Sequence, residues 1–132
     1  MIESLGSVVV TVPAQAASVH VLRAVVASVA ARLELSIDAV EEMRIAIDEA
    51  AALLLQLDGA TVLRAQISAD ASTVATLLST DGAVVSEWPP PGAERSWPWR
   101  VITGLCDEAA FERSVDGPAI LMRRDRGAGA GE

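Results

Sequence analysis

Residues 35–57, LSIDAVEEMRIAIDEAAALLLQL, are the stretch around which the fold is predicted to be organised. Apolar side chains recur here at intervals of three and four residues, which is typical of a helix with one buried face. Ser36 is placed to cap the first turn of this helix. The pattern therefore predicts a long amphipathic helix with two adjacent carboxylates, Asp48 and Glu49, near its centre.

The segments on either side of this helix predict a two-layer domain. Strands are indicated by β-branched runs and alternating patterns, and helices by the 3.6-residue period. In chain order we expect a strand at 7–12, a helix at 18–33, the long helix, strands at 61–67 and 73–78, a loop at 81–95, a helix at 96–105, and a hairpin of strands 111–115 and 118–122. This order favours an α+β two-layer sandwich, in which helices cover one face of a mixed or antiparallel sheet.

The length and the composition of the ends define the domain. A chain of 132 residues can bury one hydrophobic core, and we expect a single domain over residues 1–124. Residues 125–132 are rich in glycine and charge and have nothing to bury, so they are predicted to be a disordered tail.

Composition excludes several classes of function. The formal charge of −8 argues against direct nucleic-acid binding, which needs clustered cations, and favours a basic or mixed-charge protein partner. No apolar run reaches the length of a membrane span, and the opening MIESLG lacks the basic region of a secretory signal. The single cysteine, Cys106, excludes an internal disulfide and fits a reducing cytoplasm. We therefore expect a cytoplasmic protein with no membrane contact.

Two residue types are missing altogether, lysine and asparagine. All ten cations are arginines, and a GC-rich genome that avoids AT-rich codons accounts for this pattern. Whatever the cause, any mechanism that needs an asparagine carbonyl or a lysine ammonium is excluded. His20 is the only histidine, so no metal site with paired histidines is expected, and His20 itself is predicted to be solvated.

A resemblance to a known family rests on residues 39–57, AVEEMRIAIDEAAALLLQL. They resemble the second helix of the anti-sigma-factor serine kinases, small members of the Bergerat-fold (GHKL) ATPases, whose helix reads "IKIAVSEACTNAVRHA". The strand, proline and helix that contain Arg23, and the ending WRVITGLCDEAAFERSVDGPAILMRR at 99–124, also match the family's order. The resemblance implies the Bergerat, or histidine-kinase-like ATPase, fold over nearly the whole chain.

The family's metal-binding position is altered in this chain. In the family the glutamate of this helix is the proposed general base, and an asparagine four residues later supplies an oxygen to Mg²⁺. Glu49 is kept here, but Leu53 stands at the asparagine position. Leucine has no lone pair, and Mg²⁺ requires near-octahedral oxygen ligands. Glu49 is therefore a vestigial candidate base, and no metal site is expected.

The two other nucleotide-binding boxes of the family are also eroded. The adenine box, Asp-x-Gly-x-Gly, aligns with residues 80–84, TDGAV, where Asp81 and Gly82 are the only remnants. The family's last helix opens with Gly-x-Gly so that phosphates can approach backbone N–H groups. Ser96 and Pro98 stand there instead, and proline has no N–H. The sequence therefore predicts no bound cofactor and no kinase activity.

With the nucleotide-binding boxes eroded, the function that the resemblance still implies is the binding of protein partners. It implies an anti-sigma factor that sequesters an alternative sigma factor and is itself controlled by an anti-anti-sigma protein of the STAS type. It also implies a homodimer. The predicted partner-binding residues are Arg23, Trp88 and Arg95, since arginine and exposed tryptophan are favoured interface anchors.

Alternatives remain open for individual residues and for the function. Arg23 is equally consistent with a solvated helix arginine, and Trp88 with a side chain folded over the prolines of its own loop. Trp97 and Trp99 are predicted to fill the vacated nucleotide pocket. The alternative function is an active ATP-dependent protein serine kinase that phosphorylates an anti-anti-sigma factor, with Glu49 as base. A third is another small molecule bound in the apolar remnant of the pocket, beside Leu53 and the two tryptophans.

Overall fold

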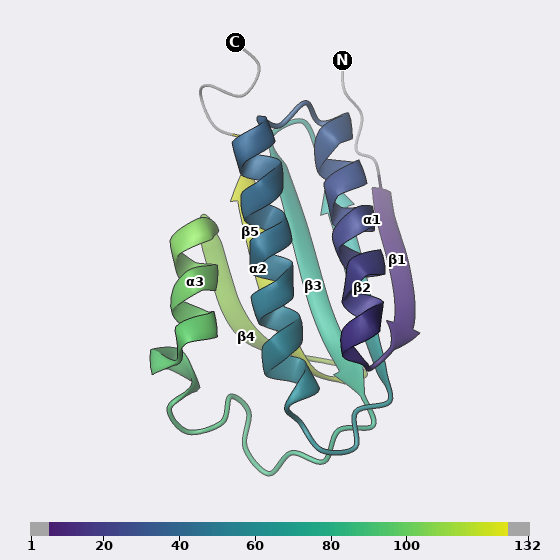
Figure 1. Cartoon of the computed structure of the whole chain (residues 1–132), viewed down its shortest axis with the longest axis vertical. Coiled ribbons are helices and arrows are strands. Elements are labelled where there is room, and N and C mark those ends of the chain that lie inside the picture. The colour runs from purple at the N-terminus through teal and green to yellow at the C-terminus, as the bar shows by residue number, and fades with distance from the viewer. Residues whose placement is uncertain (1–5, 127–132) are drawn as a thin grey trace.

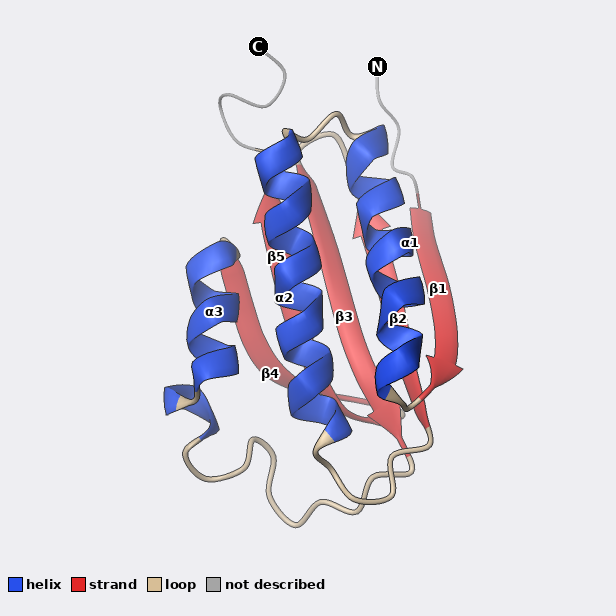
Figure 2. Ribbon diagram, viewed as in Figure 1, coloured by secondary structure: helices blue, strands red, loops and turns tan. Residues whose placement is uncertain are grey.

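Antiparallel strands and helices form two layers in the part of the chain that the computed structural model describes, residues 6–126 (Figures 1 and 2). The strands are β1 (Gly6–Pro13), β2 (Val62–Ala69), β3 (Thr73–Asp81), β4 (Glu108–Ser114) and β5 (Gly117–Asp125). The helices are α1 (Val19–Arg32), α2 (Ile37–Leu55) and α3 (Trp97–Leu105), with 3-10 turns at Ala16–Ser18 and Ala93–Arg95. All three helices cover the same face of the sheet (Figure 2).

The sheet has the strand order β1-β2-β3-β5-β4, and every neighbouring pair is antiparallel. The two helices α1 and α2 connect the edge strand β1 to β2. Helix α3 connects β3 to the other edge strand, β4, and β5 then returns between them. The predicted α+β arrangement with helices on one face is confirmed, and of the mixed and antiparallel alternatives the antiparallel one is correct.

Local signals explain where the helices begin. Ser36 caps α2, because its Oγ accepts a hydrogen bond from the Ala39 N–H at 3.1 Å. Ser96 caps α3 in the same way, accepting from the Trp99 N–H at 3.4 Å. The strands extend one to three residues beyond most of their predicted limits, because backbone pairing continues past the residues with strong β-propensity.

The hairpin between β4 and β5 differs from its prediction by one residue. Asp116 and Gly117 were expected to be the turn, but Val115 and Asp116 form it and Gly117 already pairs with Ser114. A Cβ on Gly117 would lie 2.6 Å from the carbonyl oxygen of Thr80. Glycine is thus needed here for close approach to β3 as well as for its φ of +141°.

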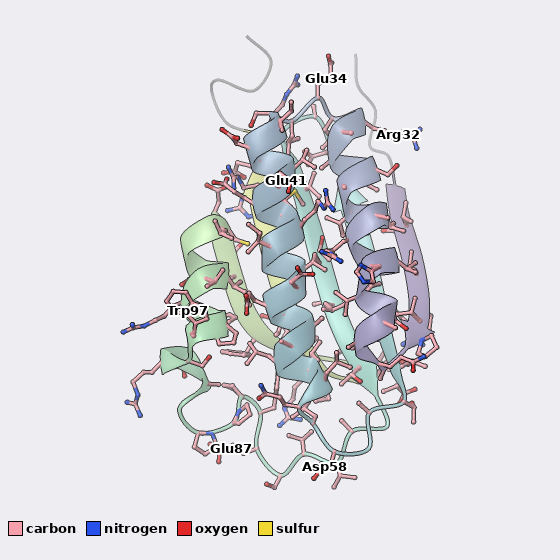
Figure 3. The ribbon with its side chains drawn as sticks, in the orientation of Figure 1. Arg32, Glu34, Glu41, Asp58, Glu87 and Trp97 are labelled. Carbon is pink, nitrogen blue, oxygen red and sulfur yellow. The ribbon has the colours of Figure 1, made fainter. Side chains whose placement is uncertain are left out.

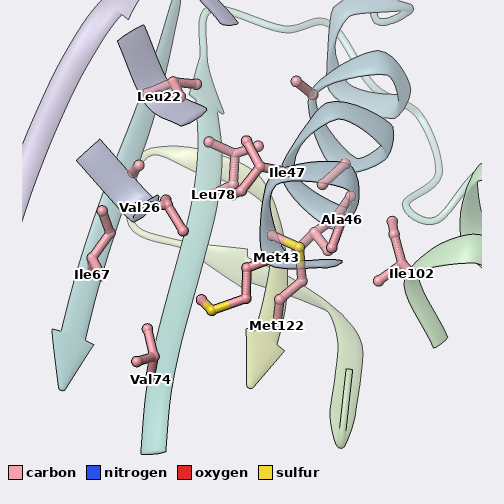
Figure 4. Packing of buried hydrophobic residues seen from close by; sticks show 14 of the residues in the cluster. Leu22, Val26, Met43, Ala46, Ile47, Ile67, Val74, Leu78, Ile102 and Met122 are labelled. Atoms are coloured by element: carbon pink, nitrogen blue, oxygen red, sulfur yellow. The ribbon is translucent and has the colours of Figure 1, made fainter. Parts of the chain in front are cut away.

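The core lies between the sheet and the helices (Figure 4). Leu22 and Val26 of α1 and Ile47 of α2 face the sheet, where they meet side chains of the central strands (Figure 4). Ile102 of α3 is also fully buried. The predicted apolar stripe of α2 is therefore the face that the helix buries.

The predicted tail begins too early. Asp125 is the last residue of β5, and its N–H donates to Asp107 Oδ2 at 2.7 Å. The Arg126 N–H donates to the Ser72 carbonyl at 2.6 Å. Backbone hydrogen bonds therefore hold both residues in place. The remainder of the predicted tail, 127–132, and residues 1–5 of the predicted domain lie outside the described residues.

Candidate functional site

A hollow of about 420 Å³ lies between the C-terminal end of α2 and the loop before α3, and is called the α2–loop hollow below. In Figure 1 this loop runs beneath the lower ends of α2 and α3. The hollow is lined by Leu53, Gln56, Leu57, Trp88, Pro90, Pro91, Gly92, Ala93 and Ser96. None of these side chains carries a charge. Leu53, which aligns with the metal-binding asparagine of the kinases that the sequence resembles, is part of this wall and is only 8% exposed.

Trp88 forms another wall of the hollow and is buried, with 8% of its surface exposed. Its indole N–H donates to the carbonyl oxygens of Glu112, at 2.9 Å, and Ala119, at 3.2 Å. Its ring meets Phe111 edge to face, with centroids 5.3 Å apart. The prediction that Trp88 is exposed is therefore wrong, because the β4–β5 hairpin packs against its ring and accepts hydrogen bonds from its N–H.

The two tryptophans of α3 have opposite environments. Trp99 stacks on Phe111 with centroids 4.0 Å apart, so its packing against another side chain is confirmed. That it fills a vacated nucleotide pocket stays a prediction. Trp97 is 71% exposed and extends outward from the start of α3 (Figure 3), so the same prediction is wrong for it. Neither residue is among those that line the α2–loop hollow. A first-turn position on the outer side of a short helix leaves Trp97 without a surface to cover it.

The N-terminus of α3 has few N–H groups to offer a phosphate. Pro98 has none, the Trp99 N–H donates to Ser96 Oγ, and the Arg100 N–H donates to the Ser96 carbonyl at 3.1 Å. Pro98 and the Ser96 cap thus remove two donors of the first turn that a phosphate site would use.

Asp81 and Gly82 belong to a crossing of two backbone segments. The Asp81 carbonyl accepts hydrogen bonds from the Thr61 N–H at 2.8 Å and the Thr61 hydroxyl at 3.1 Å. A Cβ on Gly82 would lie 2.7 Å from the Gly59 carbonyl oxygen, and one on Gly59 would lie 2.8 Å from that of Gly82. We call this contact the glycine crossing (Gly59 and Gly82). Neither Asp81 nor Gly82 lines the α2–loop hollow, so the remnant adenine box is not assembled there.

The two central carboxylates of α2 also point to different surroundings. Asp48 forms an ion pair with Arg23, whose Nε lies 3.3 Å from Asp48 Oδ1, and Arg23 Nη2 donates to Nδ1 of His20. These three side chains help to line a second hollow of about 280 Å³ between α1 and α2. Glu49 is partly exposed and lines neither hollow. The two adjacent carboxylates of α2 therefore do not share one environment.

The remaining residues singled out from the sequence do not form one site. Arg23, predicted to bind a partner, is held between α1 and α2 with 25% of its side chain exposed. Arg95 is exposed at the end of the turn before α3. His20 is exposed, as predicted. Cys106 is half-buried just after α3, and burial raises the pKa of its thiol to about 11, so the reactive thiolate is disfavoured.

Sequence reasoning missed most of the α2–loop hollow. Gln56 and Leu57 followed the helical pattern, and Pro90 and Pro91 were interpreted only as breakers of regular structure. The triproline itself was the available signal, because a rigid loop facing the end of a helix is able to keep a hollow open.

Further observations limit the chemistry of residues 6–126. Within this range no three or more histidine, cysteine, aspartate or glutamate side chains are grouped as a metal site. No helix among these residues is both long and apolar enough to cross a bilayer. No protein-family model matches this chain, and no curated protein matches it.

Proposed function

We propose that this protein is an anti-sigma factor that binds and sequesters an alternative sigma factor, on a Bergerat fold whose nucleotide site is degenerate. In this proposal a STAS-type anti-anti-sigma protein releases the sigma factor. The observation that carries the proposal is the uncharged α2–loop hollow, with Leu53 where the related kinases have a metal-binding asparagine.

The arrangement of elements supports the fold assignment. A Bergerat domain places helices on one face of its sheet, with the nucleotide between the long helix and the loop before the last helix. This chain has the same layers, and a hollow at that place. Together with the resemblance of residues 39–57 and 99–124, this supports descent from the kinase-like family.

Electrostatics argue against Mg-ATP as the ligand. A triphosphate needs cations or free N–H groups, and the wall of the hollow supplies no charged side chain. At the start of α3 the Trp99 N–H is used by the Ser96 cap, and Pro98 has no N–H to offer. Leaving a charge uncompensated in such a site costs several kcal/mol. Binding of a partner, in contrast, requires only surface, of roughly 1,600 Å² in total for a typical specific complex.

The partner surface is proposed around the start of α3. Arg95 is exposed there, and Trp97, 71% exposed, takes the anchoring role that the sequence assigned to Trp88. Tryptophan and arginine are the residue types most enriched among interface residues that dominate binding energy.

The direct test is complex formation with the alternative sigma factors of the same genome, followed by transcription in vitro. We expect one sigma factor to co-elute with the protein and to lose activity when it is added. Trp97→Ala and Arg95→Ala should weaken this complex at least tenfold. Ile37→Ala, at an exposed apolar position at the start of α2, is the matched control and should leave it unchanged. Failure to bind or inhibit any cognate sigma factor would refute the proposal.

The rival function, an active serine kinase, is separated by calorimetric titration with Mg-ATP. We expect no saturable binding up to about 1 mM nucleotide, which corresponds to a binding free energy weaker than about −4 kcal/mol. Micromolar binding that Glu49→Ala abolishes would instead establish the kinase.

A further inference from the structure

We propose that the α2–loop hollow binds an uncharged and largely apolar small molecule that carries a carboxamide-like group. This inference concerns the hollow alone and does not depend on the identity of the protein partner. It rests on the size of the hollow, on its preformed walls, and on the single polar side chain left free to contact a ligand.

The size and the rigidity of the hollow suit a small ligand. Its volume of about 420 Å³ falls within the usual range of roughly 300–1,000 Å³ for ligand pockets. Leu53 is fixed on α2, and two hydrogen bonds of the Trp88 indole fix another part of the wall. Pro90 and Pro91 restrict the backbone of the loop. Ligand binding would therefore cost little free energy for ordering the side chains and the loop of the site.

The absence of charged side chains from the wall of the hollow predicts an uncharged ligand. Neither a cation nor a carboxylate lines the α2–loop hollow, so a charged ligand would lose hydration without gaining a partner. Two other hollows among the described residues differ in this respect. Arg23 and Asp48 line the one between α1 and α2, and Arg32 lines the groove of about 540 Å³ between β1 and α1, called the β1–α1 groove below.

The polar group of the ligand follows from Gln56. Three polar side chains line the hollow, and two of them are already hydrogen-bonded within the chain: the Trp88 N–H to Glu112 and Ala119, and the Ser96 hydroxyl to Ala93 at 2.6 Å. The exposed amide of Gln56 makes no side-chain hydrogen bond within residues 6–126. An amide both donates and accepts, and a carboxamide matches both functions.

A matched pair of probes tests this inference. Naphthalene-2-carboxamide and naphthalene-2-carboxylate have the same shape and differ in charge. Titration followed by NMR should show saturable binding of the carboxamide, with a Kd near or below about 1 mM for a ligand of this size. The shifts should include the Gln56 side-chain amide and the Trp88 indole N–H. The carboxylate should bind at least tenfold more weakly.

Three variants assign the binding to the hollow. Leu53→Trp fills it and should abolish binding, whereas Ala24→Trp in the β1–α1 groove should leave binding unchanged. Gln56→Leu, at an exposed position that leaves the core intact, should remove the preference for the carboxamide over 2-methylnaphthalene. Absence of saturable binding overturns the inference. So do carboxylate binding as tight as that of the carboxamide, and a preference that survives Gln56→Leu.

Sigma-factor binding by the same samples separates this inference from the proposed function. Loss of the sigma complex with retained carboxamide binding would refute the anti-sigma proposal alone. An intact sigma complex without carboxamide binding would refute the ligand alone.

Discussion

The role of a single residue in this chain depends on its surroundings in the fold as well as on its residue type, and Gly82 is an example. Gly82 was identified from the sequence as a remnant of an adenine-binding box, but it touches the backbone of Gly59 instead. Its φ of +83° lies in the left-handed region that favours glycine. Gly82 therefore has a structural explanation that involves no nucleotide.

This explanation predicts the cost of adding one methyl group at Gly82. Gly82→Ala combines an unfavourable φ with a Cβ 2.7 Å from the Gly59 carbonyl oxygen and 2.9 Å from Thr61 Cγ2. We expect it to lower the free energy of unfolding by about 3 kcal/mol, measured by urea denaturation.

Gly92→Ala is the matched control for that measurement. Gly92 has nearly the same φ, +82°, but a Cβ there meets nothing within 4 Å. Only the backbone cost of about 1 kcal/mol should appear. Equal losses for both variants would mean that the glycine crossing (Gly59 and Gly82) contributes no steric constraint of its own.

At the scale of elements, much of this fold was predictable because its signals are local. The two serine caps, the helical periods of α1 and α2, and the alternating strands depend on residues close together in sequence. The surroundings of the tryptophans were not predictable in this way. Trp88 is buried by Phe111 and by the β4–β5 hairpin, more than 20 residues further along the chain, so only tertiary structure separates it from exposed Trp97.

The loop before α3 is therefore predicted to depend on the Trp88 indole for its attachment to the sheet. Trp88→Phe removes the donor to the Glu112 and Ala119 carbonyls and leaves a small cavity. We expect a loss of about 2–3 kcal/mol in the free energy of unfolding.

Trp97→Phe serves as the control in the same denaturation experiment and should change stability by no more than about 0.5 kcal/mol, because the side chain is 71% exposed. Tryptophan fluorescence gives a second measure. Loss of Trp88 should remove the most buried emitter, whereas loss of Trp97 should remove an exposed one. Equal destabilisation by both substitutions would contradict the burial of Trp88.

At the scale of the whole molecule, the layers and the site differ in how far sequence determined them. Each strand and helix was recognisable, and their order left few ways to cover one face of the sheet. The α2–loop hollow is made by segments more than 30 residues apart, and no local pattern describes its uncharged wall. The residue type at position 53 was informative about metal binding on its own, because a leucine side chain has no atom that can ligate a metal.

A nucleotide site is a property of the whole arrangement, so restoring one residue should not restore it. Leu53→Asn places on α2 the metal-binding side chain of the kinases that the sequence resembles. The hollow still lacks any cation, the donors at the start of α3 still bond to Ser96, and Asp81 and Gly82 still form a backbone crossing. We expect calorimetry to find no Mg-ATP binding tighter than about 1 mM. We also expect a loss of about 1–3 kcal/mol in the free energy of unfolding, from burying an amide without its partners.

The triple variant Leu53→Asn, Ser96→Gly, Pro98→Gly frees the helix donors but adds no cation. It should also fail to bind Mg-ATP, with circular dichroism confirming that it is folded. Magnesium-dependent binding by the single variant would show that one missing asparagine side chain is the entire obstacle to ATP binding by this chain.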